Sequence, residues 1–154
     1  MSLALLGLGS NLGDRGANVR RALELLAERG AASVVAVSTL CETAPEGGPP
    51  QGDFLNAAAL VETELRPREL LAALKAVERA LGRRPGGPRW GPREVDLDLL
   101  LYDALVVDEP DLQVPHPRMH ERRFVLEPAA EVAPSMRHPT LGRTVQELLA
   151  GLDA

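Results

Sequence analysis

The stretch REVDLDLLLY, residues 93–102, contains the most hydrophobic predicted strand of this chain and raises a question about its function. Its apolar residues predict a buried strand, yet Asp96 and Asp98 lie within it, two positions apart. Because side chains alternate along a strand, the two carboxylates share one face while Leu97 and Leu99 occupy the other. Two ionised carboxylates this close repel each other, and a bound Mg²⁺ would relieve the repulsion. The alternative is an antiparallel strand whose polar face is simply wetted by solvent.

The segments around this strand predict an alternation of strands and helices. Short apolar or β-branched runs predict strands at residues 2–9, 32–43, 54–63 and 94–102. Apolar residues at helical spacing predict helices at residues 17–29, 67–81, 121–130 and 144–152. Thr144 and Glu147 have the spacing of a capping box at the start of the last helix. The order β-α-β-β-α-β predicts one α+β domain over residues 1–154, a ferredoxin-like α-β-α sandwich with a mostly antiparallel sheet.

The composition limits the class of protein and its partners. The chain of 154 residues carries a formal net charge of −5, which argues against a nonspecific nucleic-acid binder. No basic leader precedes the first apolar run, and no window approaches the roughly 20 apolar residues of a membrane-spanning helix. The single cysteine, Cys41, excludes an internal disulfide and is expected to be a small buried residue at a strand end. We therefore expect a cytoplasmic protein with no membrane or nucleic-acid partner.

An arginine-rich loop, GRRPGGPRWGPR at residues 82–93, leads directly into the acidic strand. The arginines of this loop and of the next irregular region are Arg83, Arg84, Arg89, Arg93, Arg118, Arg122 and Arg123. A guanidinium group binds phosphate oxygens and neutralises their charge, so arginines beside an acid pair indicate phosphoryl transfer. For any one of these arginines, solubility is the simpler explanation. The segment GLGSNLG, residues 7–13, matches neither a Walker A loop nor a dinucleotide-binding fingerprint.

Three further residues each allow two interpretations. Trp90 lies in the arginine-rich loop and either anchors packing or stacks on a planar ligand. His116 lies between two prolines and either donates to a phosphate or has no role. Asn56 is a polar residue in an apolar strand, and it either reads the edge of a heterocycle or bonds to local backbone.

Three motifs together resemble one family. They are GLGSNLGDR at residues 7–15, RWGPREVDLDLLLYD at residues 89–103 and VPHPRMHERRFVLEPAAEVAP at residues 114–134. In this order they are similar to the 6-hydroxymethyl-7,8-dihydropterin pyrophosphokinases of folate biosynthesis, over essentially the whole chain. The resemblance implies transfer of pyrophosphate from ATP to the pterin hydroxymethyl group with release of AMP, and we expect a monomer.

The resemblance also implies roles for particular residues. Asp96 and Asp98 would hold two Mg²⁺ ions. The catalytic residues would be Arg83, Arg93, Asp96 and Asp98. The pterin would be bound by Thr43, Ala44, Glu46, Phe54, Asn56, Trp90, Asp96 and Phe124. The ATP would be bound by Lys75, Glu78, Arg84, Arg93, Leu99, His116, Arg118 and Arg122. The segments around Gly13, Gly48 and Gly86 match loops that close over the site.

Two other classes of protein remain open on the residues alone. A single-stranded RNA-binding module could use a ferredoxin-like sheet, but it would need stacking aromatic residues, and the chain has one Trp, one Tyr and two Phe. Tight, salt-sensitive RNA retention on a filter would favour that class. A scaffolding domain with a merely solvated acid pair is the other alternative, and Mg²⁺-dependent binding of an unreactive ATP analogue would contradict it.

Overall fold

A computed structural model of the chain describes residues 1–10, 15–43, 54–81 and 95–152. The elements up to the acidic strand are β1 (Ser2–Ser10), α1 (Arg15–Glu28), β2 (Ser33–Val37), β3 (Cys41–Thr43), β4 (Phe54–Thr63), α2 (Pro67–Ala80) and β5 (Asp96–Tyr102). The main sheet has the strand order β2-β4-β1-β5, β3 also pairs with β4, and each of these pairs is antiparallel. The fold is therefore the predicted ferredoxin-like α+β sandwich.

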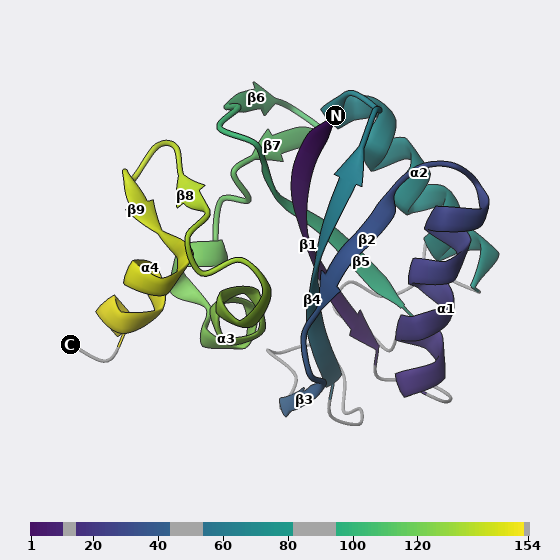
Figure 1. The fold of residues 1–154 in the computed structure, drawn as a ribbon, viewed down its shortest axis with the longest axis horizontal. Helices are drawn as coiled ribbons and strands as arrows, with labels where there is room; N and C mark the ends of the chain where they lie inside the picture. The colour runs from purple at the N-terminus through teal and green to yellow at the C-terminus, as the bar shows by residue number, and fades with distance from the viewer. Residues whose placement is uncertain (11–14, 44–53, 82–94, 153–154) are drawn as a thin grey trace.

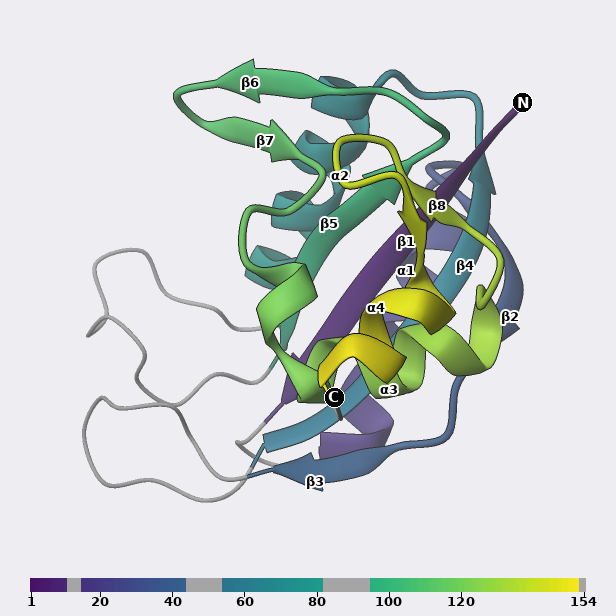
Figure 2. The same cartoon turned by 90° about the vertical axis from the view of Figure 1, so that its left-hand side faces the viewer.

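Helices cover both faces of this sheet (Figure 1). On one face, α1 and α2 pack against a core that includes Leu6, Leu8, Leu97 and Leu99. On the other face, η1 (Met119–Glu121), α3 (Arg123–Val132) and α4 (Val145–Leu152) pack against Leu5, Ala58 and Leu101, among others. Figure 2 shows this second layer in front of the sheet, where α3 lies over β4 and β1. The sheet thus separates two apolar cores, and β5 contributes to both.

The strand predicted at residues 32–43 is divided into β2 and β3, which corrects the sequence-based expectation. Between the two strands, the Ser38 hydroxyl donates to the carbonyl of Thr39 (2.8 Å) and accepts from the backbone N–H of Ala58 (2.9 Å). The carboxylate of Glu131 on α3 accepts both the backbone N–H and the hydroxyl of Thr39, each at 2.9 Å. The backbone N–H of Ser38 still donates to the Ala58 carbonyl (2.9 Å), but the Ser38 hydroxyl takes the place of a backbone carbonyl in the reciprocal bond, and the regular ladder of β2 ends here.

Two short hairpins were not predicted. They are formed by β6 (Val107–Glu109) with β7 (Leu112–Val114), and by β8 (Arg137–His138) with β9 (Arg143–Thr144). Strands of two or three residues are too short to show a hydrophobic period, so long-range contacts must hold them in place. Arg68 at the start of α2 supplies such contacts to the first hairpin, because it is paired with Asp111 (2.9 Å) and with Glu109.

The predicted capping box at α4 is confirmed. The backbone N–H of Thr144 donates to Glu147 Oε1 at 2.8 Å, and the backbone N–H of Glu147 donates to Thr144 Oγ1 at 3.2 Å. These bonds lower the pKa of Glu147 below its ordinary range.

Removing the cap should destabilise the protein without affecting the chemistry of a distant site. We expect Thr144→Ala to lower the free energy of unfolding by about 1 kcal/mol, because one N–H at the helix start loses its acceptor. Urea denaturation followed by circular dichroism measures this. Thr144→Ser, which keeps the hydroxyl, should retain most of the stability, and equal losses in the two variants would contradict the capping role.

No helix in the described part of the chain is both long enough and apolar enough to cross a membrane.

Candidate active site

Strand β5 places the predicted metal ligands on the face of the sheet that α3 covers. Leu97 and Leu99 are both 5% exposed and belong to the core beneath α1 and α2. Asp96 and Asp98, which alternate with them, therefore point to the opposite face, and both are only partly buried. The structure thus confirms the predicted alternation of leucine and aspartate side chains between the two faces of β5.

A strip without side chains lies beside the two carboxylates. Gly9 is directly opposite Asp96 on the neighbouring strand, and Gly7 is opposite Asp98. On the far side of β1, Asn56 is opposite Gly9, and it is 8% exposed. Opposed residues of antiparallel strands point to the same face, so Asn56, Gly9 and Asp96 form one row across the sheet. The amide and the carboxylate at its ends are two strand spacings apart, about 10 Å between Cα atoms.

The role of the two glycines was not predicted from the sequence. The sequence feature that indicates them is the alternation Gly7-Leu8-Gly9. In a strand, this alternation places both glycines on one face, which then carries no side chain at these two positions. Cys41 extends the row, because it lies opposite Asn56 on β3. It begins its strand as expected but is only partly buried, which corrects the expectation of burial.

The segment after β7 brings a histidine to the outer edge of β5. The backbone N–H of His116 donates to the carbonyl of Leu100 at 2.9 Å. The ring Nδ1 accepts the backbone N–H of Arg118 at 3.2 Å. Burial lowers the pKa of His116 below its ordinary 6.5, the positive charges of Arg122 and Arg118 lower it further, and Asp96 opposes them. The imidazole is therefore neutral at pH 7, and its one proton is assigned to Nε2 because Nδ1 accepts.

This shift can be measured directly. In the protein without nucleotide or Mg²⁺, the NMR titration midpoint of the His116 ring should lie below 6.5. Because the unfolded chain binds this proton more tightly, the group leaves stability unaffected above about pH 6.5 and lowers it as the pH falls toward the folded-state pKa. His116→Asn identifies the signal. A midpoint at or above 6.5 would contradict the burial of the ring among positive charges.

The start of α3 joins two residues from different predicted subsites. The guanidinium carbon of Arg122, predicted to bind ATP, lies 5.5 Å from the ring centroid of Phe124, predicted to bind the pterin. A cation over an aromatic face at this distance is an attractive arrangement, so each side chain limits the movement of the other. Arg118, also predicted to bind ATP, is exposed two residues after His116.

Helix α2 and β5 hold the remaining described residues of the predicted ATP site. Lys75 is exposed on α2, whereas Glu78 on the same helix is buried. A carboxylate oxygen of Glu78 accepts the backbone N–H of Leu97 at 2.8 Å. The side chain of Leu99 lies in the core, so any contact of this residue with a nucleotide would involve its backbone.

Several predicted site residues lie outside the part of the chain that the structure describes. They are Ala44, Glu46, Arg83, Arg84, Arg89, Trp90 and Arg93, together with the segments around Gly13, Gly48 and Gly86. Of Thr43 and Phe54 only the backbones are described, and these lie opposite each other on β3 and β4.

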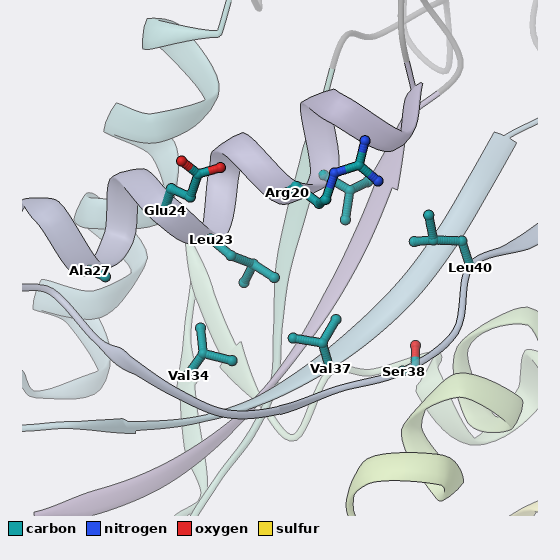
Figure 3. A pocket seen from close by; sticks show the side chains of 9 residues that line it. Arg20, Leu23, Glu24, Ala27, Val34, Val37, Ser38 and Leu40 are labelled. Carbon is teal, nitrogen blue, oxygen red and sulfur yellow. The ribbon is translucent and has the colours of Figure 1, made fainter.

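An apolar groove at the other edge of the sheet is a separate feature (Figure 3). It has a volume of about 630 Å³ and lies between α1 and β2, where Leu23, Val34 and Val37 point into it. Because β2 and β5 are the two edges of the sheet, the groove lies across its full width from Asp96 and Asp98. We do not assign it to the active site.

The arrangement around β5 defines a class of protein. Within the described residues, no three His, Cys, Asp or Glu side chains gather to hold a metal by themselves. A carboxylate pair beside neutral histidine and arginine side chains instead suits an ion that shares its coordination with phosphate groups. An α+β domain with these side chains at one edge of its sheet is typical of enzymes that transfer phosphoryl groups.

Comparisons with known proteins identify the family. The family model of 7,8-dihydro-6-hydroxymethylpterin-pyrophosphokinase (HPPK) matches residues 5–134, so the chain belongs to this family. A 2-amino-4-hydroxy-6-hydroxymethyldihydropteridine pyrophosphokinase of Bacillus subtilis is 44% identical over 147 residues, which cover 95% of this chain and 87% of the relative. A protein of the same name from Methylorubrum extorquens is 46% identical over 153 residues, covering 99% of this chain and 95% of the relative.

Solved structures agree on the fold. The crystal structure of wild-type Plasmodium falciparum HPPK-DHPS with pteroate matches 97% of this chain with a TM-score of 0.76 and 15% sequence identity. A structure of HPPK-DHPS in complex with substrates gives a TM-score of 0.75 and 13% identity. This chain spans 42% and 43% of those longer chains. At such low identity, the likeness bears on the fold alone.

Proposed function

We propose that this chain transfers the pyrophosphoryl group of ATP to the hydroxymethyl group of 6-hydroxymethyl-7,8-dihydropterin, in tetrahydrofolate biosynthesis. The observation that carries the proposal is the row of Asn56, Gly9 and Asp96, with Asp98 beside it. A flat bicyclic ring could lie on the bare glycine strip between an amide and a carboxylate, both suited to its hydrogen-bonding edge. Membership of the pyrophosphokinase family supports the same reaction.

The reaction is a displacement at phosphorus. The hydroxymethyl oxygen forms a bond to the β-phosphorus, the bond from this phosphorus to the α–β bridging oxygen breaks, AMP leaves, and the hydroxyl proton is released. Catalysis of such a transfer consists mainly of positioning and charge stabilisation. We assign positioning of the pterin to Asn56 and Phe124, and stabilisation of phosphate charge to Arg83, Arg93 and Arg122. Neutral His116 would donate from Nε2 to a phosphate oxygen.

We further propose that Asp96 and Asp98 hold two Mg²⁺ ions. Mg²⁺ prefers oxygen ligands and usually takes one or two carboxylates together with substrate phosphates, and this pair meets that requirement. When bound, the metal would neutralise phosphate charge and lower the barrier to displacement. We also propose that the protein works as a monomer in the cytoplasm, where ATP is available and the thiol of Cys41 stays reduced.

Product analysis tests the proposal. The protein is incubated with ATP, Mg²⁺ and the hydroxymethylpterin, and the nucleotide product is identified by chromatography. AMP formed in equal amount to pterin pyrophosphate supports the proposal, and omission of the pterin or chelation of Mg²⁺ should stop AMP formation. ADP as the product would indicate an ordinary kinase instead.

A further inference from the structure

Glu78 is a buried acid whose contact differs from that expected of a nucleotide ligand. It lies on α2, is 4% exposed, and its Oε2 accepts the backbone N–H of Leu97 at 2.8 Å. Leu97 is the residue between Asp96 and Asp98. The carboxylate therefore binds the peptide segment that connects the two predicted metal ligands.

The contact matters because β5 is an edge strand. One side of β5 pairs with β1, and the N–H of Leu97 points away from that pairing. A buried N–H without an acceptor is costly, and an edge strand lacks the second neighbour that would supply one. Glu78 supplies the acceptor at Leu97, and the N–H of His116 bonds to the carbonyl of Leu100 three residues later. The outer edge of β5 is thus held at both of these points.

The direction of approach separates positioning from direct binding. Helix α2 packs on the sheet face that holds Leu97 and Leu99, whereas the aspartates point to the other face. Glu78 therefore approaches β5 from the face of the sheet opposite to the side chains of Asp96 and Asp98. The Leu97 N–H belongs to the peptide that joins Asp96 to Leu97, one residue before Asp98, so an acceptor that fixes this peptide restrains the backbone that carries both carboxylates.

We propose that Glu78 is a positioning residue, which holds Asp96 and Asp98 in their metal-binding arrangement through the Leu97 amide and does not act as a nucleotide ligand. The proposal rests on the proposed function, because it takes the aspartates as metal ligands. Outer residues that orient metal ligands typically change metal affinity or activity by about 10–100-fold when they are mutated.

The test compares Glu78→Ala, Glu78→Gln and a charge-matched control. Glutamine keeps an oxygen acceptor but removes the charge, and alanine removes both. Glu64→Gln makes the same charge change at an exposed residue next to Thr63, which lies opposite Ser2 at the other end of the sheet from Gly9 and Asp96. Two readouts are taken: hydrogen exchange of the Leu97 amide by NMR without ligands, and the dependence of AMP formation on Mg²⁺ and on ATP.

A positioning role predicts a specific pattern. In Glu78→Ala the Leu97 amide should exchange at least about 10-fold faster, and turnover or apparent Mg²⁺ affinity should fall by about 10–100-fold. Glu78→Gln should keep exchange protection and lose no more than about fivefold in activity, because a neutral acceptor is only moderately weaker. The Glu64→Gln control should behave as the unmodified protein.

Other results would overturn the inference. Unchanged Leu97 exchange in Glu78→Ala would show that the contact does not hold the strand. A raised KM for ATP, with turnover and Mg²⁺ dependence unchanged, would make Glu78 a nucleotide ligand. If Glu78→Gln changed amide exchange and activity as much as Glu78→Ala does, the negative charge of Glu78, and not its role as a hydrogen-bond acceptor, would account for the effects. If the unmodified protein forms no AMP, the proposed function fails, whereas the exchange measurement still reports on the Glu78 contact.

Discussion

Replacing Asp96 or Asp98 by alanine should abolish pyrophosphoryl transfer, with turnover lowered by at least about a thousandfold. Each substitution removes one of the two carboxylates that lie beside Gly7 and Gly9. Among the described residues, no group of three or more His, Cys, Asp or Glu side chains could hold a metal ion in place of the lost ligand. A single remaining carboxylate would bind Mg²⁺ more weakly than the pair. AMP formation at saturating Mg²⁺ and ATP measures the loss.

The same variants should leave the fold nearly intact. Both side chains are partly exposed and lie outside the apolar cores, so the free energy of unfolding should change by no more than about 1 kcal/mol. Asp108→Asn, at an exposed position on the β6–β7 hairpin, controls for the loss of one negative charge and should retain activity. Normal turnover in Asp96→Ala or Asp98→Ala would refute the metal assignment.

Replacing Arg93 by alanine should lower turnover by about 10²–10³-fold. The residue lies outside the described part of the chain, so this prediction rests on chemistry and on the family resemblance. Negative charge develops toward the departing AMP, and a guanidinium stabilises it more in the transition state than in the bound substrate. An interaction of that kind lowers kcat and kcat/KM together.

The kinetic pattern tests this role. Arg93→Lys keeps the charge but loses the planar fork, so it should recover only part of the turnover. Arg21→Ala removes an exposed arginine that is paired with Glu28 (3.1 Å) on α1, and it should not change the kinetics. A rise in KM with an unchanged turnover number would remove Arg93 from the catalytic residues and leave it as a binding residue.

The parts of the fold that could be predicted are those with a local signal. The alternation in residues 96–99 predicted which side chains enter the core, and the spacing of Thr144 and Glu147 predicted the helix start. Pro67 is the first residue of α2, as the sequence indicated. In each case the physical cause lies within a few neighbouring residues, so one segment is enough to infer it.

The parts that could not be predicted depend on distant partners. At the break after β2, Thr39 bonds to Glu131 on α3, and these residues are 92 positions apart. The burial of Glu78 requires α2 to meet the edge of β5. Gly7 and Gly9 lie beside the aspartates only because of the register that pairs β1 with β5. Each of these roles depends on a contact between segments that are distant in the sequence, and a local pattern does not reveal such a contact.

The glycine strip has a consequence for how the protein can evolve. A Cβ atom at Gly7 would meet the nearest side-chain atoms of Leu100 at 3.5 Å, which is an ordinary contact. An alanine there is thus compatible with folding, although its methyl group would lie beside Asp98 and against the Leu100 side chain. Selection for stability and selection for catalysis therefore act differently at this position. A library of Gly7 variants sorted only for soluble expression would retain substitutions such as alanine. A growth selection that requires folate synthesis would remove them.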